Sequence, residues 1–206
     1  MPVKGMFLKK NKMKKCFVLF VFVSLFLCNN VYSNQTNYEE KIKNYFFKIE
    51  NFTSTFIQSD EISVEEGIIY LKKKINRIKI EYNKPSSIVI ILAKKKGLYV
   101  NLDLEEIEYF NPEDSIANIF YDIFYNVKFL DEASIKENNS VIEVTKNINL
   151  KNEKVKIKII FEKNPLLIKK LIMINKEQII NLTLINPNFN AVLDSKIFSL
   201  ANPLLN

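Results

Sequence analysis

From Gly67 onward, apolar and polar residues alternate with a period of two over much of the chain, and this pattern limits the folds available to it. The alternation is clearest in one run: Arg77, Ile78, Lys79, Ile80, Glu81 and Tyr82. A period of two predicts strands with one face buried and the other wet or covered by another part of the molecule. Further strands are predicted at 52–58, 87–93, 98–102, 107–110, 141–146, 155–161, 166–174, 178–185 and 197–200.

Two segments follow the helical period instead. Ile42, Tyr45, Phe46 and Ile49 have the spacing i, i+3, i+4 and i+7 of one helix face, and residues 36–39 resemble a capping box before them. Residues 111–114 form a second helix-start signal. The apolar stripe that follows it consists of Ile116, Ile119, Phe120, Ile123 and Phe124.

The order of these segments predicts an α+β domain: a helix, a run of antiparallel strands, a helical insertion and a second run of strands. A sheet with so many strands must curl or split. We therefore expect a curled sheet with two amphipathic helices, and no internal repeat or linker divides it.

The first 33 residues have the pattern of a secretory signal peptide. Six lysines precede the apolar run 16–27, which is too short to span a bilayer, and residues 31–33 form a plausible cleavage site. Translation could also begin at Met13. We therefore expect an exported protein with a single domain over residues 34–206; an uncleaved membrane anchor is the alternative.

Removal of this leader changes the charge of the chain. The full sequence has 30 basic and 23 acidic residues, whereas residues 34–206 have 24 and 23, a net charge of +1. This balance argues against a nucleic-acid partner, which needs a concentrated basic patch. Both cysteines, Cys16 and Cys28, lie in the leader, so no disulfide is expected in the exported chain.

The residue types left for catalysis are few. The chain has no histidine, which excludes Ser-His-Asp, Cys-His and His-containing metal sites, and we expect no cofactor or metal. The adjacent pairs Glu65-Glu66 and Glu105-Glu106 do not converge, because neighbouring strand residues point to opposite faces. The lysine triplets 72–74 and 94–96 read as solvated charges, with an anionic docking surface as the alternative. A carrier or binding module is favoured over an enzyme.

Several segments, in order, resemble the periplasmic outer-membrane lipoprotein carrier family, LolA. The family has Phe-x-x-x-Phe-x-Gln after a first helix, as in residues 52–58, and a glycine-led apolar strand, as at Gly67–Leu71. It then has a strand that ends before a proline, as in 78–85, and a C-terminal pattern like that of 190–203. The resemblance implies an incomplete, unclosed antiparallel β-barrel, with an N-terminal helix and an inserted helical lid over an apolar concave face.

The resemblance also implies which residues would act. The residues expected to line the acyl-chain site are Phe56, Ile69, Leu71, Ile78, Ile80 and Tyr82, and those expected in the lid are Ile119, Phe120, Ile123 and Phe124. The family holds its lid by an arginine bound to backbone carbonyls. Lys74 takes that place here without the planar fork of arginine, and Arg77 is a second candidate. For every one of these residues, ordinary core packing or a solvated charge is the alternative.

The expected function is that of a monomeric periplasmic carrier for acylated lipoproteins. An inner-membrane ABC-type lipoprotein release complex would be the donor, and an outer-membrane acceptor would take the cargo. Two other functions stay open: a lipid- or lipoprotein-sensing envelope module, and a structural envelope protein without a cavity.

Overall fold

The computed structural model describes residues 29–150, 153–176 and 178–205. Residues 1–41 and 42–206 form two compact units, and each is described by itself. The first contributes the start of helix α2 (Asn29–Lys48), whose last turns belong to the second. Most of the predicted signal peptide, residues 1–28, lies outside the described residues.

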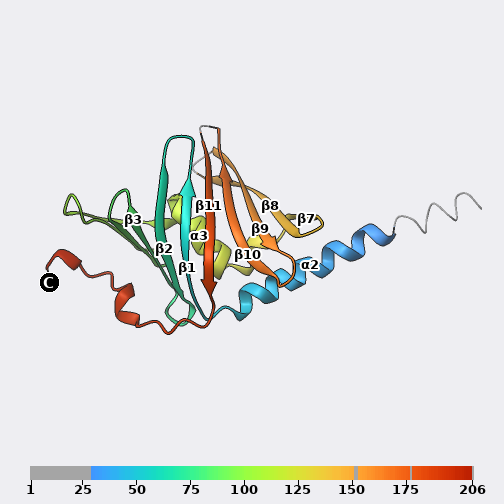
Figure 1. The fold of residues 1–206 in the computed structure, drawn as a ribbon, viewed down its shortest axis with the longest axis horizontal. Coiled ribbons are helices and arrows are strands. Elements are labelled where there is room, and N and C mark those ends of the chain that lie inside the picture. Colours follow the sequence, from blue (N-terminus) through green and yellow to red (C-terminus); the bar gives the residue numbers. More distant parts are fainter. Residues whose placement is uncertain (1–28, 151–152, 177, 206) are drawn as a thin grey trace, which may run out of the picture. The chain divides into compact units, whose positions relative to one another are not determined.

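The second unit holds one antiparallel sheet, drawn in Figure 1. Its eleven strands are β1 (Asn51–Ser59), β2 (Val64–Lys72), β3 (Arg77–Lys84), β4 (Ile88–Leu92), β5 (Gly97–Asn101), β6 (Glu106–Phe110), β7 (Ser134–Glu137), β8 (Val141–Leu150), β9 (Glu153–Glu162), β10 (Leu167–Ile174) and β11 (Ile179–Asn188). The strand order runs β6-β5-β4-β3-β2-β1-β11-β10-β9-β8-β7, and the ends do not pair. The predicted unclosed antiparallel barrel is therefore confirmed.

The strand order explains where the helical insertion lies. The pairing of β1 with β11 joins two meanders, so that β6 and β7 become the opposite edges of the sheet. The connection between these edges consists of the 3₁₀ turn η2 (Pro112–Asp114), helix α3 (Ile116–Tyr125) and the 3₁₀ turn η3 (Val127–Leu130). The chain must cross from one edge to the other, and Figure 1 shows α3 within the curve of the sheet.

One face of the sheet, here called the inner face, is apolar across both meanders. In the first meander, the register aligns Ser54, Ile69, Ile80 and Ile90 in one row. In the second, it aligns Leu182, Leu171, Ile159 and Val144. These residues are buried except for Ile90, which is partly exposed. Burial of this face is what the alternating sequence predicts. The opposite face is also covered in part, because Ile91, Leu98 and Val100 are buried there with Leu200 packed against them.

The predicted first helix face is confirmed. Ile42, Phe46 and Ile49 are buried, and Tyr45 is half-buried with its hydroxyl accepting a hydrogen bond from the Ile168 amide. The rings of Tyr45 and Phe46 meet Phe161 of β9 edge-on, with centroids 5.7 and 5.8 Å apart. The last turns of α2 are thus fixed to the sheet by aromatic packing.

Two local predictions were wrong, and one strand was not predicted. Residues 195–198 form a 3₁₀ turn rather than a strand, because the Asp194 carboxylate accepts the Lys196 amide at 2.9 Å and caps the turn. The expected capping box at Thr36 lies inside α2, since no Gly or Pro interrupts residues 29–36. Strand β7 was missed, because four residues are too few to show a period.

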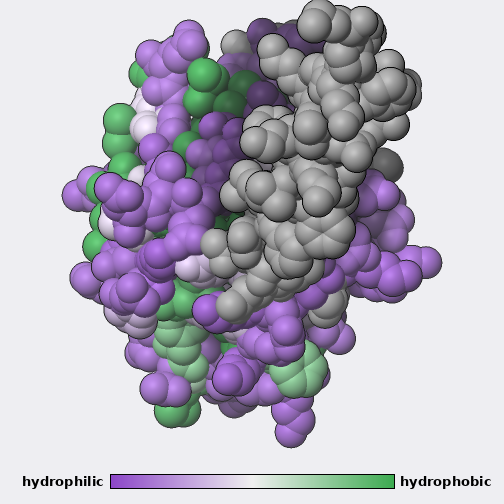
Figure 2. Space-filling model, turned by 90° about the vertical axis from the view of Figure 1, so that its right-hand side faces the viewer, coloured by the Kyte–Doolittle hydropathy of each residue, from purple (hydrophilic) through white to green (hydrophobic). Residues whose placement is uncertain are grey.

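The outer surface is mostly polar. In Figure 2, hydrophilic residues form most of the visible described surface, and hydrophobic residues gather in smaller areas between them. Among the described residues, no helix combines the length and the apolar character that crossing a bilayer requires.

Candidate functional site

The six residues expected to line the site lie on the inner face of three neighbouring strands. Phe56 comes from β1, Ile69 and Leu71 from β2, and Ile78, Ile80 and Tyr82 from β3. Five are buried, with exposed fractions of 4% or less, and Tyr82 is partly exposed. Cross-strand pairing sets Ile69 opposite Ile80 and Leu71 opposite Ile78. The structure therefore brings all six together in one apolar patch.

Gly67 makes room for the aromatic end of this patch. It pairs with Phe56 on one side and with Tyr82 on the other. A Cβ atom at Gly67 would lie 2.6 Å from Cζ of Phe56 and 2.1 Å from the Glu81 carbonyl oxygen. Only glycine leaves this space, and the ring of Phe56 uses it to meet the Tyr82 ring edge-on, with centroids 5.2 Å apart.

The four expected lid residues lie on α3 and are buried. Ile119, Phe120, Ile123 and Phe124 have exposed fractions of 3–7%. The ring of Phe124 packs against Phe46 of α2 and Phe52 of β1, with centroids 5.6 and 5.8 Å apart. Helix α3 therefore covers part of the inner face in this structure with its apolar stripe.

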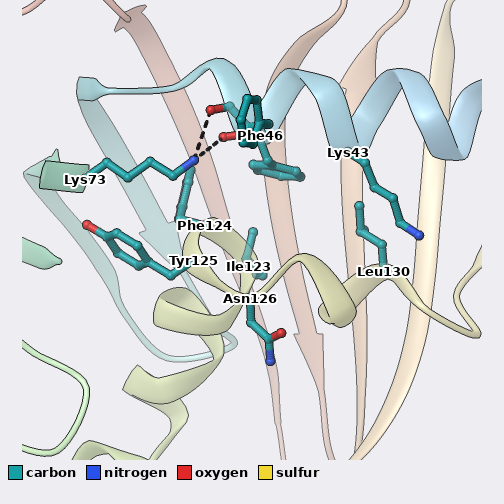
Figure 3. A pocket seen from close by; sticks show the side chains of 9 residues that line it. Lys43, Phe46, Lys73, Ile123, Phe124, Tyr125, Asn126 and Leu130 are labelled. Atoms are coloured by element: carbon teal, nitrogen blue, oxygen red, sulfur yellow. Dashed lines mark hydrogen bonds between the residues drawn. The ribbon is translucent and has the colours of Figure 1, made fainter.

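A small apolar cavity opens beside this cover. It has a volume of about 210 Å³ and lies between the last turn of α2, the end of α3 and η3 (Figure 3). Its lining consists of Lys43, Phe46, Phe47, Lys73, Ile123, Phe124, Tyr125, Asn126 and Leu130. Sites for small organic ligands commonly measure about 300–1,000 Å³. The cavity alone is thus too small for a long acyl chain while α3 stays in place.

Lys73 ties the end of α2 to the turn between β2 and β3. Its ammonium group donates hydrogen bonds to the carbonyl oxygens of Phe46 at 2.9 Å and Phe47 at 3.1 Å, as the dashed lines in Figure 3 show. The carbonyl end of a helix attracts a cation. Burial lowers the pKa of Lys73. We call this pair of hydrogen bonds the lysine tie.

Tyr125 ties α3 to the same turn. Its hydroxyl lies 2.9 Å from the Arg77 carbonyl oxygen and 3.3 Å from that of Lys72, and it donates to the nearer one. Its ring stacks on Tyr121 with centroids 4.5 Å apart. Burial, followed by the neighbouring Tyr121, raises the pKa of Tyr125, so its hydroxyl keeps the proton that it donates. We call this contact the tyrosine tie.

The two residues expected to hold the lid have other surroundings. Lys74 is exposed in the 3₁₀ turn η1 (Lys73–Ile75). Arg77 is half-buried; it offers its backbone carbonyl to Tyr125, and its charge lies near enough to Tyr121 to lower the pKa of that residue against the raising effect of burial. The direct ties come from Lys73 and Tyr125. Sequence spacing singles out the lysine triplet, but not the member whose side chain faces α2.

A third set of contacts holds the segment after α3. Lys146 of β8 donates to the carbonyl oxygens of Phe129 at 2.8 Å and Asp131 at 3.0 Å. The Asp131 carboxylate forms an ion pair with Lys43 of α2 at 3.1 Å. The segment that follows α3 is thus held to β8 and α2 by polar contacts. Water can replace polar contacts more readily than it replaces apolar packing.

A polar cluster borders the aromatic end of the inner face. The Gln58 amide donates to the Glu65 carboxylate at 2.6 Å, and the Tyr82 hydroxyl donates to the Gln58 carbonyl at 3.1 Å. Burial raises the pKa of Tyr82 to about 12. Burial and the charge of Asp60 raise the pKa of Glu65. No pattern in the sequence singles out this cluster, although Gln58 ends the Phe-x-x-x-Phe-x-Gln pattern.

The family of the chain follows from comparison with known proteins. The family model described as outer membrane lipoprotein carrier protein LolA matches residues 48–201. This range includes every described strand, α3, and the side chains of Lys73 and Tyr125. The chain belongs to the LolA family. A comparison with curated proteins gave no significant match.

Solved structures resemble this LolA-family chain in fold only. An uncharacterized conserved protein from Thermus thermophilus is 5% identical, with a TM-score of 0.50 over 82% of this chain and 95% of that one. A DUF1329 family protein from Desulfovibrio piger is 6% identical, with a TM-score of 0.49 over 80% and 97%. MucB in the MucA/MucB complex of Pseudomonas aeruginosa is 11% identical, with a TM-score of 0.45 over 78% and 61%.

Family membership supports a periplasmic role in carrying or binding rather than catalysis. The described residues contain no cluster of three or more His, Cys, Asp and Glu side chains suited to a metal ion. The site is an apolar sheet face beneath an apolar helix, and such a surface binds by excluding water.

Proposed function

We propose that this protein shields the acyl chains of lipoproteins and carries them between the inner and outer membranes. The observation that carries the proposal is the pairing of two apolar surfaces: the inner face of β1–β3 and the stripe of α3, which cover each other. Displacement of α3 would offer both surfaces to an acyl chain and enlarge the apolar area around it.

The energies fit such an exchange. Burial of an acyl chain is worth about 0.8 kcal/mol per CH₂ group, so a chain of ordinary length gains about 12 kcal/mol. The two ties add only about 1 kcal/mol per hydrogen bond. An incoming acyl chain therefore replaces the contacts of α3 with the inner face by its own contacts with that face. The few hydrogen bonds that hold α3 affect how readily it moves.

The residues proposed to line the open site are the six inner-face residues, with Ile119, Phe120, Ile123 and Phe124 as the cover. Tyr125 is proposed as the contact that holds the cover shut, in place of a family arginine, and Lys73 as the contact that holds the adjoining end of α2. The inner-membrane release complex as donor and an outer-membrane acceptor complete the proposal. Residues 1–33 are proposed as the export signal, which would deliver residues 34–206 to the periplasm.

The test is binding of a triacylated lipopeptide with a fluorescent label, followed by anisotropy and by co-elution in gel filtration. Ile80→Glu on the inner face and Phe120→Glu on the cover should each abolish binding. Ile68→Glu is the matched control: Ile68 lies on β2 with its side chain on the opposite face, only partly buried, and its replacement should leave binding intact.

The outcomes separate the alternatives. Binding that survives both Ile80→Glu and Phe120→Glu, with each variant still folded by circular dichroism, would contradict the carrier proposal. Absence of binding by the unaltered protein would favour a structural envelope protein. Binding without transfer of lipopeptide to acceptor vesicles would favour a sensing module.

A further inference from the structure

One end of the sheet gathers exposed apolar side chains and lysines that the proposed carrier role does not use. At this end β1 turns into β2, β10 leads to β11, and β8 leads to β9. The register places the ends of β1, β2, β9, β10 and β11 beside one another, because Ser59 pairs with both Val64 and Asn181, and Ile174 pairs with both Ile179 and Lys156. Figure 1 shows the β1–β2 and β10–β11 ends side by side.

We call this region the strand-tip surface, defined by Ile62, Val64, Lys154, Lys156, Lys176 and Ile179. Its apolar members have exposed fractions of 96% for Ile62, 61% for Val64 and 42% for Ile179. Single exposed apolar residues are ordinary, but several on adjoining turns mark a contact surface.

The lysines line a groove next to these apolar residues. The groove has a volume of about 590 Å³, and Lys154, Lys156 and Lys176 contribute its charges. Three asparagines share the lining and add hydrogen-bond donors: Asn147, Asn149 and Asn175. A small pocket of about 50 Å³ beside it includes the apolar side chains of Leu150, Val155, Met173 and Ile180.

We propose that the strand-tip surface docks on a bilayer that contains anionic phospholipid. Lysines beside exposed apolar side chains are the pattern of an interfacial membrane contact, in which ammonium groups meet phosphates and apolar groups enter the acyl boundary. The charge complementarity selects anionic headgroups. An acidic protein would pair with the lysines, but it gives no reason for the exposure of Ile62 and Val64.

Acidic groups at the same end oppose this attraction. The Asp60 carboxylate is engaged within its own turn, where it accepts the amides of Ile62 at 2.8 Å and Ser63 at 2.7 Å. Glu61 is exposed, and Glu153 lines the small pocket. Removal of one such charge should strengthen membrane binding, so Glu61→Gln is expected to bind anionic vesicles about threefold more tightly.

The docking proposal stands independently of the cargo, because vesicles without lipoprotein test it. Sedimentation of the full chain with vesicles of phosphatidylglycerol and phosphatidylcholine is compared with sedimentation with phosphatidylcholine alone. The triple variant Lys154→Gln, Lys156→Gln, Lys176→Gln should bind anionic vesicles about a hundredfold more weakly, since each lysine contributes about fivefold near such a surface.

The matched control is Lys94→Gln, Lys95→Gln, Lys96→Gln. These three exposed lysines lie in the turn between β4 and β5, at the opposite end of the sheet. Both triple variants lose the same charge and keep the basic first 15 residues, so only the position of the lysines differs. Equal losses in the two variants, or equal binding to both kinds of vesicle, would overturn the proposal.

A second measurement reports insertion directly. The chain has no tryptophan, so Ile62→Trp and Ile179→Trp each introduce a single probe. Both should shift their emission to the blue on anionic vesicles and be quenched by brominated lipid. Val192→Trp is the control, because Val192 is 100% exposed and follows the far end of β11.

Two further outcomes would count against docking on a bilayer. One is that the emission of the probe at Ile62 does not shift and that free glycerophosphate displaces all of the protein from the vesicles. This result would indicate that the groove binds a soluble anion. The other is that the protein binds an acidic polypeptide as tightly as it binds vesicles, that the polypeptide blocks binding to vesicles, and that the emission of the probe at Ile62 does not shift.

Discussion

Gly67 shows how a single residue shapes the candidate site. It is one of three glycines in the chain, and it lies where the Phe56 ring and the Glu81 carbonyl leave no room for a side chain. The absence of a Cβ atom allows an aromatic ring to lie close over a strand. The family pattern that begins at Gly67 therefore has a steric cause.

We expect Gly67→Ala to destabilise the protein by about 2–3 kcal/mol, because a Cβ atom there would meet a backbone carbonyl that cannot turn away. The measurement is urea unfolding followed by circular dichroism. Gly97→Ala is the matched control: the nearest atoms to its Cβ atom belong to the Phe110 side chain, which can move as a whole more readily than a backbone carbonyl, so a smaller loss is expected. A larger loss at Gly97 would contradict this account.

Glu65 gives a prediction about pH. Burial and Asp60 raise its pKa in the folded state, so the folded protein holds this proton more tightly than the unfolded chain. The resulting stability is present below the unfolded pKa and is lost as the pH rises through the folded pKa.

Glu65→Gln cannot ionise, so it should be more stable than the unaltered protein at about pH 7 and no more stable at about pH 3. Urea midpoints at the two pH values measure the difference. Glu61→Gln removes a neighbouring exposed charge and serves as the control. A Glu65→Gln variant less stable than the unaltered protein at about pH 7 would show that the charged hydrogen bond from Gln58 outweighs burial.

Among the secondary-structure elements, α3 is held differently from the strands. Each strand is joined to its neighbours by a ladder of backbone hydrogen bonds, whereas α3 meets the sheet through side chains. The polar contact of α3 itself with the sheet runs through the Tyr125 hydroxyl. This difference makes α3 the element that can leave without breaking the sheet.

Tyr125→Phe removes that hydroxyl and keeps the ring stacked on Tyr121. We expect α3 to open about five- to tenfold more often, since one hydrogen bond contributes about 1 kcal/mol. Hydrogen exchange of the α3 amides should quicken by that factor. Tyr121→Phe is the control and should leave the exchange unchanged.

At the level of the whole protein, the sheet and its cover should have different stabilities. The central strands β1, β2 and β11 have paired neighbours on both sides, while α3 bridges the sheet edges β6 and β7. Local opening of a native protein involves first the elements with the fewest backbone hydrogen bonds to the rest of the molecule.

Native-state hydrogen exchange should therefore show α3 opening at lower free energy than β1, β2 and β11. Addition of a triacylated lipopeptide should change protection in α3 and along the inner-face strands, and leave the outer edge strand β7 unaffected. Exchange of α3 only through global unfolding, with and without lipopeptide, would rule out a cover that moves.

The sequence by itself determined most of the strands, the two amphipathic helices and a curled sheet, and its resemblance to the family implied that the sheet does not close. Alternation such as that of Ile78 and Ile80 is local, and a period of two or of 3.6 residues reads directly as a strand or a helix. The resemblance implied the six inner-face residues, and alternation within each strand agrees with it, since Ile78, Ile80 and Tyr82 lie two positions apart and share one face.

Only the tertiary structure decided which side chains hold α2 and α3 to the turn between β2 and β3. Lys73 and Lys74 are adjacent and chemically identical in sequence, but the 3₁₀ turn aims Lys73 at the α2 carbonyls and leaves Lys74 exposed. Tyr125 meets the Arg77 carbonyl across 48 positions. The strand-tip surface likewise arises from turns that lie far apart in the chain. Contacts of this kind depend on the path of the backbone in space, which no local pattern records.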